Sequence, residues 1–318
     1  MGYLQQEAAW PAAVSRPTIG WEEPACLLCG RRHWSQIVEA PDTSAGGSGL
    51  WFAVVQCREC GLCFTNPRPD RASIGQFYPP GYGPHQPRDV ERRPRRRPAT
   101  WRMPGQPWRT LPWPGPGRLL DFGCGRGSFL ERVRRQGWQA TGIDVAGVAD
   151  QCVRGESASP VLVGTLPHPE LVPASFDVIT MWHSLEHVHD PLAVLGEAHR
   201  LLVPGGQLLV AVPNIDSLPF GWFAQAWIGL DLPRHLTHFT PGTLHSMLRR
   251  AGFKVGRLRL VRHSHWLRAS AVLSERLLPR PRWRRWLKAG PPSRLATWYA
   301  FLTGRADCLQ VAATRIEN

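Results

Sequence analysis

The sequence predicts an α/β protein with a Rossmann-like, doubly wound sheet, preceded by a small zinc ribbon. Ahead of the middle of the chain, an apolar run ends at Asp121 and is followed by glycines at alternate positions, Gly123, Gly125 and Gly127. This pattern is typical of a buried strand, a tight turn and the start of a helix. Near the N-terminus, four cysteines form two C-x-x-C pairs, which is the spacing of a zinc site.

Composition and spacing divide the 318 residues into four expected segments. Residues 1–23 show no hydrophobic periodicity and are expected to be a loose leader. Residues 24–83 hold the cysteine module and a connector. Residues 84–117 are rich in proline, arginine and tryptophan, and proline at this density cannot continue helices or central strands, so a linker is expected. Residues 118–318 then form the α/β domain.

The cysteine pairs predict a structural zinc ion. Each pair lets two thiolates reach one ion from a single turn, and two pairs complete a tetrahedral site with no position open for substrate. A module of about 40 residues has too small a core to fold unaided, whereas structural zinc can contribute about 10 kcal/mol. Cys63 leaves an iron–sulfur cluster open as the alternative, although Pro67 stands where its fourth cysteine would fall. The predicted zinc ligands are Cys26, Cys29, Cys57 and Cys60.

The glycine turn predicts a nucleotide-like cofactor. A second strand is expected to end at Asp144, and an acid about 20 residues beyond a glycine-rich turn is where a doubly wound sheet binds ribose hydroxyls. The third glycine comes one residue earlier than in the dinucleotide fingerprint, which disfavours a nicotinamide cofactor. An acid at position 121 suits a ligand with an ammonium group and a sulfonium better than one with phosphates.

The segment around the glycine turn resembles motif I of the class I methyltransferases that depend on S-adenosylmethionine (SAM). The resemblance extends to residues 176–182, which are similar to the fourth strand of those enzymes, and to residues 201–208, which are similar to their turn into the fifth strand. It implies an antiparallel last strand and SAM as the cofactor. The residues it assigns to cofactor binding are Asp121, Gly123, Gly125, Gly127, Asp144 and Trp182.

Capping signals and periodicity predict the remaining elements. Asp190-Pro191 and Thr240-Pro241 each read as an N-cap followed by proline at the first helical position. The aromatic segment 215–240 is expected to be loop-like, which favours a lid over the acceptor. The other expected elements are a strand over 207–212, strands over 253–261 and 308–316, and helix for much of 264–302.

The cysteine module resembles the zinc-binding segment that precedes the methyltransferase domain in a group of bacterial enzymes. Residues 60–69, which continue from the second cysteine pair, are similar to the corresponding stretch in this group, and so are residues 233–240. The resemblance implies a methyltransferase that acts on an oxygen or carbon of a small molecule, sugar or lipid-linked glycan.

Histidines at two places are candidate general bases. Ligands of open α/β sheets bind beyond the carboxyl ends of the strands, and there His183 and His187 follow the fourth strand. His235 and His238 lie in the aromatic segment. A base can accelerate transfer to a hydroxyl or an acidic carbon by about 10²–10⁴-fold. The alternative is that these side chains only brace their loops.

Charge and hydropathy bear on whether the protein binds nucleic acid or a membrane. The net charge of +14 comes from 38 basic residues of which only Lys254 and Lys288 are lysines, so it reflects an arginine-rich composition and no specific nucleic acid is expected. No apolar run reaches the roughly 18 residues of a membrane span, and we expect a cytoplasmic protein.

Residues 279–288 mix arginine with tryptophan and could rest on an anionic membrane, although a solvated basic helix is the simpler interpretation. Two further alternatives are an RNA methyltransferase, with the ribbon and linker holding the nucleic acid, and an inactive SAM-fold protein.

Overall fold

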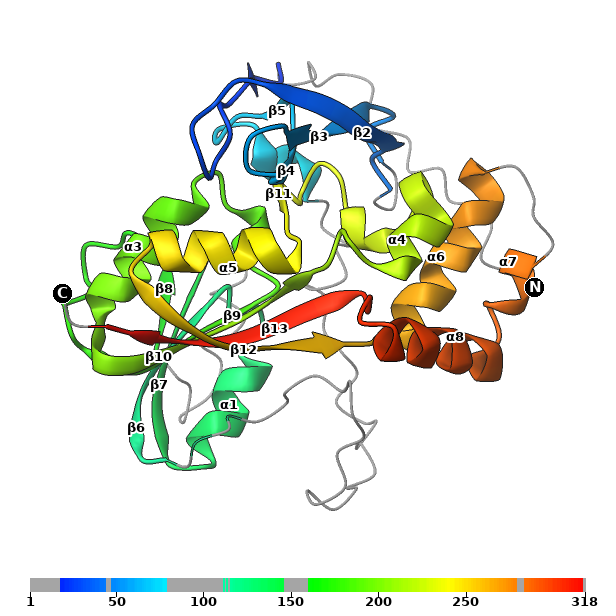
Figure 1. The fold of residues 1–318 in the computed structure, drawn as a ribbon. Coiled ribbons are helices and arrows are strands. Elements are labelled where there is room, and N and C mark those ends of the chain that lie inside the picture. The colour runs from blue at the N-terminus through cyan, green and yellow to red at the C-terminus, as the bar shows by residue number, and fades with distance from the viewer. Residues whose placement is uncertain are drawn as a thin grey trace, which may run out of the picture.

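The computed structural model describes residues 18–43, 47–78, 111, 113, 115–145, 160–278 and 283–316. In this part of the chain, a large central sheet with helices on both faces lies beneath a smaller sheet built from the N-terminal residues (Figure 1). A helical unit extends from the end of the molecule opposite the C-terminus (Figure 1).

The central sheet has seven strands in the order β12-β13-β10-β9-β6-β7-β8. All paired neighbours are parallel except β13, which runs antiparallel to β10 and β12. This confirms the predicted fold class, including the antiparallel last strand. The strands are β6 (Gly117–Phe122), β7 (Trp138–Asp144), β8 (Val161–Val163), β9 (Phe176–Trp182), β10 (Leu202–Pro213), β12 (Phe253–Val261) and β13 (Cys308–Arg315).

The direction of strand addition reverses between β6 and β9, because β7 and β8 extend the sheet on one side and β9 and β10 on the other. Such a switch point opens a crevice at the carboxyl ends of the two strands, where open α/β sheets bind their ligands. The glycine turn leaves β6 and the histidine loop leaves β9, so both lie at this crevice.

Among the described residues, three helices flank the sheet: α1 (Ser128–Arg134), α3 (Pro191–Leu201) and α5 (Pro241–Arg250). α3 and α5 cover one face and α1 the other (Figure 1). Both predicted helix starts are confirmed, since the Asp190 carboxylate accepts a hydrogen bond from the backbone N–H of Ala193 and Thr240 forms a reciprocal capping box with Thr243.

The N-terminal module contributes three strands to a four-stranded sheet of order β11-β4-β3-β2, whose edge strand β11 (Thr237–His238) comes from the α/β part of the chain. A separate pair, β1 (Trp21–Glu22) with β5 (Arg68–Pro69), lies beside it and is followed by the short helix η1 (Ile74–Phe77). The strands of the module are β2 (Trp34–Pro41), β3 (Trp51–Cys57) and β4 (Cys63–Thr65).

The end of the expected leader is ordered. Glu22 accepts a hydrogen bond from Nε of Arg68, and the backbone of Gly20 bonds to Ser73 and Asp70. These contacts hold residues 18–23 against the ribbon, so a loose chain is wrong for them. Residues 1–17 lie outside the described residues, as does nearly all of the expected linker 84–117.

The aromatic segment 215–240 is not the loop that the sequence suggested. It contains α4 (Leu218–Phe223), η4 (Ala224–Ala226), η5 (Ile228–Leu230) and β11 (Thr237–His238), and β11 pairs with β4 of the ribbon. Its aromatic side chains Phe223 and Trp227 are buried in one cluster with Phe52 and Phe77 of the module. The expectation of a lid is therefore wrong, because these rings form the core that joins the ribbon to the α/β domain.

The helical unit between β12 and β13 consists of α6 (Ser264–Leu277), α7 (Trp283–Trp286) and α8 (Gly290–Leu302). α6 packs against α8 and against the 215–240 segment. This agrees with the helix expected over much of 264–302. Within the described residues, no helix is long and apolar enough to cross a membrane.

Candidate active site and cysteine cluster

The glycine turn is shaped by close contact with the histidine loop. Gly123 follows β6 with a φ of 72°, and a Cβ at this position would lie 2.5 Å from the Cβ of Ser184. Only glycine fits such a position, since it combines a left-handed backbone with no room for a side chain. The Ser184 hydroxyl also donates to the carbonyl of Phe122 at 2.9 Å. The turn after β6 and the loop after β9 are thus held together.

Asp144 lies at the carboxyl end of β7 and faces the glycine turn. Its carboxylate accepts hydrogen bonds from the backbone N–H groups of Gly125, at 2.7 Å, and Val145, at 2.8 Å. The side chain is only partly buried, so its remaining acceptor capacity can reach a ligand. This is the position expected for the acid that binds ribose hydroxyls.

Asp121 differs from Asp144 because it is enclosed in the sheet. It is buried and accepts a hydrogen bond from the Thr180 hydroxyl at 2.6 Å. Burial raises the pKa of Asp121 to about 7, against the lowering effect of the Thr180 hydrogen bond. Trp182, at the end of β9, packs its ring edge against Phe129 of α1 with the ring centroids 5.5 Å apart.

The candidate base His183 lies in the first position after β9, with a φ of 53°. Its Nδ1 is 3.3 Å from Oε1 of Glu186, and its Nε2 is 4.0 Å from the sulfur of Cys308. The side chain is 35% exposed, and its ring lies beside that of Trp266 on α6 at 5.3 Å. His183 is therefore oriented through Nδ1 by Glu186, while its Nε2 lies toward Cys308 and part of the ring is exposed.

Glu186 is fully buried at the centre of the histidine loop. Burial by itself would raise the pKa of this carboxyl, but the hydrogen bond to His183 and the neighbouring histidines hold it below its ordinary value. Its Oε1 also lies 4.0 Å from Nε2 of His235. Among the described residues, its Oε2 has no hydrogen-bond partner.

His187 is less suited to accept a proton. Its Nδ1 lies 2.9 Å from the hydroxyl of Tyr78, and its ring meets that of His235 edge to face at 4.6 Å. Burial, together with the charge of His235, lowers the pKa of His187 to about 4. This side chain is neutral near pH 7 and is held between the ribbon connector and the aromatic segment.

The other two candidate histidines point in different directions. His235 bonds to the carbonyl of Gly229 through Nδ1, at 2.9 Å, so that Nε2 faces Glu186. His238 is turned to the ribbon, with its Nε2 3.1 Å from the Thr65 hydroxyl, and burial lowers its pKa to about 3. The structure thus gathers His183, His187 and His235 around Glu186 and leaves His238 outside this group.

The same cluster has the donor set of a small metal site. The ligand atoms of Glu186, His187 and His235 lie within 4.8 Å of one another. A nitrogen–oxygen set of this kind could hold a divalent cation, so a chelator is a necessary control in any test of these side chains.

Sequence reasoning missed several residues of this site. Tyr78 reaches His187 from the connector, and Cys308 reaches His183 from β13. His263 stacks on Trp266 at 4.6 Å, and its backbone N–H donates to the buried Asp307. The H-x-H-W run that begins at His263 was the available signal, but nothing local to it shows that it adjoins the histidine loop after β9.

The four predicted cysteines form one cluster. The sulfur of Cys26 lies 3.4 Å from that of Cys60, the sulfur of Cys29 lies 3.5 Å from that of Cys57, and all four lie within 4.8 Å of one another. A tetrahedron of thiolates at zinc–sulfur distances of about 2.3 Å has edges of about 3.8 Å, so the group fits zinc. Cys63 stands apart in β4, with its thiol directed at the carbonyl of Gly61. This placement disfavours the iron–sulfur alternative.

The two knuckles have the same backbone arrangement. The N–H of Gly30 donates to the carbonyl of Cys26 at 2.8 Å, and the N–H of Gly61 donates to that of Cys57 at 2.9 Å. Each turn thereby presents two sulfurs to the same point.

Residues 233–238 form hydrogen bonds with both the ribbon and the histidine loop. The guanidinium of Arg234 is fully buried and donates to Asp231, to Asp42 of the module and to the carbonyl of Phe77. The backbone N–H of Leu236 donates to the carbonyl of Glu186 at 2.8 Å. One short segment therefore contacts both the ribbon and the centre of the histidine loop.

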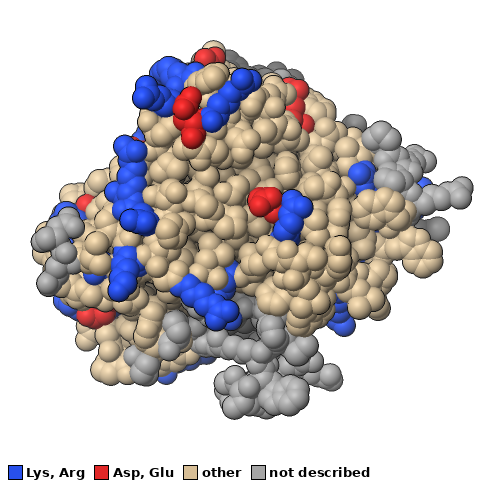
Figure 2. All heavy atoms as spheres, in the orientation of Figure 1, with Lys and Arg blue, Asp and Glu red and all other residues tan. Residues whose placement is uncertain are grey.

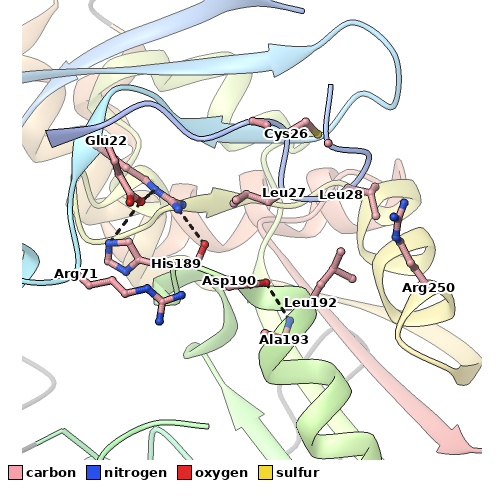
Figure 3. A pocket seen from close by; sticks show the side chains of 13 residues that line it. Glu22, Cys26, Leu27, Leu28, Arg71, His189, Asp190, Leu192, Ala193 and Arg250 are labelled. Carbon is pink, nitrogen blue, oxygen red and sulfur yellow. Dashed lines mark hydrogen bonds and ion pairs between the residues drawn. The ribbon is translucent and has the colours of Figure 1, made fainter. Parts of the chain in front are cut away.

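A cavity of about 620 Å³ lies at a different place, between the first knuckle and the start of α3 (Figure 3). Arg71 and His189 lie on one side and Arg250, from α5, on the other (Figure 3). Its lining mixes these groups with the acids Glu22 and Asp190. Neither the glycine turn nor His183 lines it, so the geometry of the loops, not this cavity, locates the candidate active site.

Comparison of the sequence with known protein families identifies the family to which the chain belongs. The sequence pattern of the family described as "Methyltransferase domain" matches residues 96–258, just over half of the chain. The protein belongs to this methyltransferase family. The expectation of a class I SAM-dependent methyltransferase, drawn from the glycine turn and the fourth strand, is confirmed.

Curated relatives include two ubiquinone biosynthesis O-methyltransferases. The one from Pseudomonas aeruginosa (strain LESB58) is 33% identical over 150 residues, which cover 43% of this chain and 65% of the relative. The one from Xanthomonas euvesicatoria pv. vesicatoria (strain 85-10) is 33% identical over 174 residues, which cover 50% of this chain and 71% of the relative. The match thus spans about two thirds of the length of these relatives.

Solved structures show a weaker likeness. A SAM-dependent methyltransferase from Mesorhizobium loti gives a TM-score of 0.45 at 20% identity, covering 64% of this chain and 94% of that one. The Burkholderia thailandensis 1,6-didemethyltoxoflavin-N1-methyltransferase gives a TM-score of 0.40 at 20% identity, with 64% and 72% covered.

Proposed function

We propose that this methyltransferase transfers the methyl group of SAM to a hydroxyl oxygen of a small molecule, with His183 as general base and a zinc ribbon as structural support. The observation that carries the proposal is the place of His183. It follows β9 at the carboxyl edge of the sheet, beside the glycine turn, with Nδ1 directed at a buried carboxylate and 35% of the side chain exposed.

SAM fits the residues at the crevice. The partly exposed carboxylate of Asp144 would accept hydrogen bonds from the ribose hydroxyls, and the turn from Gly123 to Gly127 would let the ligand approach the backbone. When bound, SAM supplies an electrophilic methyl group for an in-line displacement. The protein's part is then to align the acceptor with that methyl group.

His183 suits the role of base better than the other three histidines. With Nδ1–H donating to Glu186, the proton-free nitrogen is Nε2. It lies 4.0 Å from the sulfur of Cys308, a long contact that an acceptor hydroxyl would have to replace in order to pass its proton to Nε2. His187 is bonded to Tyr78, and His238 is buried against the ribbon. The Nε2 of His235 faces the buried Glu186 instead of the open edge of the site.

An oxygen acceptor is supported by two separate lines. A hydroxyl must lose its proton as it attacks the methyl group, and a histidine positioned beside it can accept that proton as general base. The curated relatives from Pseudomonas and Xanthomonas are named as O-methyltransferases.

One zinc ion bound by the four-cysteine cluster would complete the ribbon. Four thiolates fill a tetrahedral site, so the metal would have no open position for chemistry. Its contribution is to hold β3 and β4 in place, and through the pairing of β4 with β11 to hold the segment that carries His235.

Mass spectrometry of cell extracts incubated with the protein and deuterated-methyl SAM tests the proposal. We expect one or more small molecules to gain a deuterated O-methyl group. Calorimetry should show that Asp144→Ala weakens SAM binding by about 1.5–3 kcal/mol, the range for a hydrogen bond to a charged group. Label found only on nucleic acid, or SAM affinity that does not change in the variant, would refute it.

A further inference from the structure

Helices α7 and α8 carry large apolar side chains on the outside of the molecule. On α8, Leu295, Tyr299 and Leu302 are 72%, 60% and 75% exposed, and their spacing of four and three residues places them on one face of the helix. On α7, Trp283 and Trp286 are 46% and 69% exposed. We call these five exposed side chains, on two helices that both pack against α6, the α7–α8 face.

The amphipathic pattern of α8 is inverted. Its buried residues are Ser293, Thr297 and Ala300, which are small, while its exposed face carries two leucines and a tyrosine. The two buried hydroxyls donate to carbonyls of the same helix. A surface helix of a globular protein normally buries its large apolar residues, so the outward face of α8 is adapted to an apolar partner.

The segment that carries this face is strongly basic. Residues 262–302 contain nine arginines and lysines but a single acid, Glu275. That acid is already paired with Arg285 and Lys288. Over α8 itself the surface facing the viewer is nearly free of charge (Figure 2). A nearly uncharged apolar face on a strongly basic segment favours a partner that is apolar inside and anionic at its surface.

We propose that the α7–α8 face docks the protein on the surface of an anionic lipid bilayer. Tryptophan and tyrosine favour the boundary between headgroups and acyl chains, while leucines bury their side chains beneath it. Each nearby arginine or lysine adds electrostatic attraction to anionic headgroups. The contact is peripheral and does not depend on the proposed methyl transfer.

A second copy of the chain is a poorer occupant of this face. Two copies that met through the same surface would bring their cationic borders together, because a twofold interface pairs each patch with itself. Like charges at such short range are screened only in part at physiological salt.

Vesicle flotation of the full chain tests the proposal. The probes are vesicles of phosphatidylcholine alone and vesicles in which about one third of the lipid is phosphatidylglycerol. We expect the protein to bind the anionic vesicles at least about tenfold more tightly than the neutral ones, and less tightly as salt is raised. The double variant Leu295→Glu/Leu302→Glu should reduce binding to the anionic vesicles at least about tenfold.

Val172→Glu is the matched control, because Val172 is 63% exposed on the α/β domain away from this unit. It should bind vesicles like the unchanged protein. Equal binding to neutral and anionic vesicles, or full binding by the double variant, would overturn the proposal. Failure to bind any vesicle, combined with a dimer that the double variant dissociates in ultracentrifugation, would assign the face to a second copy. Thermal unfolding of both variants verifies that the fold is kept.

Discussion

The Nδ1 atom of His183 lies 3.3 Å from Oε1 of Glu186, a carboxylate with no exposed surface. A buried carboxylate that accepts a hydrogen bond from one ring nitrogen fixes the tautomer, so that the other nitrogen carries the lone pair that can take up a proton. Glu186 is thus a positioning residue, since it acts through His183 and does not reach the open edge of the site.

Glu186→Gln should lower turnover by at least about tenfold, because a glutamine can turn either its oxygen or its amide nitrogen toward Nδ1 and no longer fixes the tautomer. SAM affinity measured by calorimetry should stay within about twofold. His238→Gln, in a histidine outside the cluster, is the control and should retain turnover. Equal losses in the two variants would show that the loop is only braced by these side chains.

The ribbon should depend on zinc. Metal analysis should give about one zinc per chain, and a strong chelator should lower the thermal midpoint, since metal binding supplies folding free energy. Cys57→Ser should lose the metal, whereas Cys63→Ala should keep it because Cys63 lies outside the cluster. Iron in the purified protein, or metal loss in Cys63→Ala, would contradict the assignment.

Arg234 should be a stability determinant of the junction between ribbon and α/β domain. Arg234→Met removes the buried guanidinium from the buried carboxylate of Asp42 and the partly exposed carboxylate of Asp231, and breaking a buried pair costs about 3–5 kcal/mol. Arg305→Met, which removes an exposed pair with Asp216, should cost at most about 1 kcal/mol. Urea unfolding gives both values. Similar losses in the two variants would show that the buried network does not hold the junction.

Acid should destabilise the fold through the buried histidines. Burial lowers the pKa of His238 to about 3 and that of His187 to about 4, both below the unfolded value of about 6.5. As pH falls below about 6.5, the unfolded chain takes up protons that the folded protein does not, so the free energy of unfolding decreases toward pH 4.

Replacing one of these histidines should reduce that dependence. His238→Gln should flatten the slope of unfolding free energy against pH by up to about 1.4 kcal/mol per unit. Urea titrations of the zinc-loaded protein at several pH values between about 7 and 5 measure it. Parallel curves for the variant and the unchanged protein would show that His238 is not a source of acid sensitivity.

Local signals in the sequence predicted much of this fold. The glycine turn before α1 and the caps at Asp190 and Thr240 each depend on a few adjacent residues. The cysteine pairs were equally local, since each knuckle closes within five residues. These features follow from backbone geometry that a short stretch of sequence determines.

The features that the sequence did not predict are contacts between distant segments. β11 pairs with β4 although about 170 residues separate them, and Arg234 reaches Asp42 over 192 residues. The aromatic content of 215–240 fits a lid and a core equally well, and only the surface it packs against decides between them. Tyr78 and Cys308 entered the candidate site in the same way, through the meeting of separate elements.

Turnover of His183→Ala, compared with His187→Ala, tests the central claim most directly. The deuterated-methyl assay with the acceptor found in extracts measures the rate, with and without added imidazole. Each reaction is also run with and without a chelator too weak to remove a metal ion from the four-cysteine cluster. We predict that His183→Ala loses at least about 100-fold in turnover at unchanged SAM affinity, that imidazole restores part of it, and that His187→Ala keeps most of its activity. Near-normal turnover in His183→Ala, or activity in the unchanged protein that disappears with the chelator and returns with a divalent cation, would contradict a histidine base.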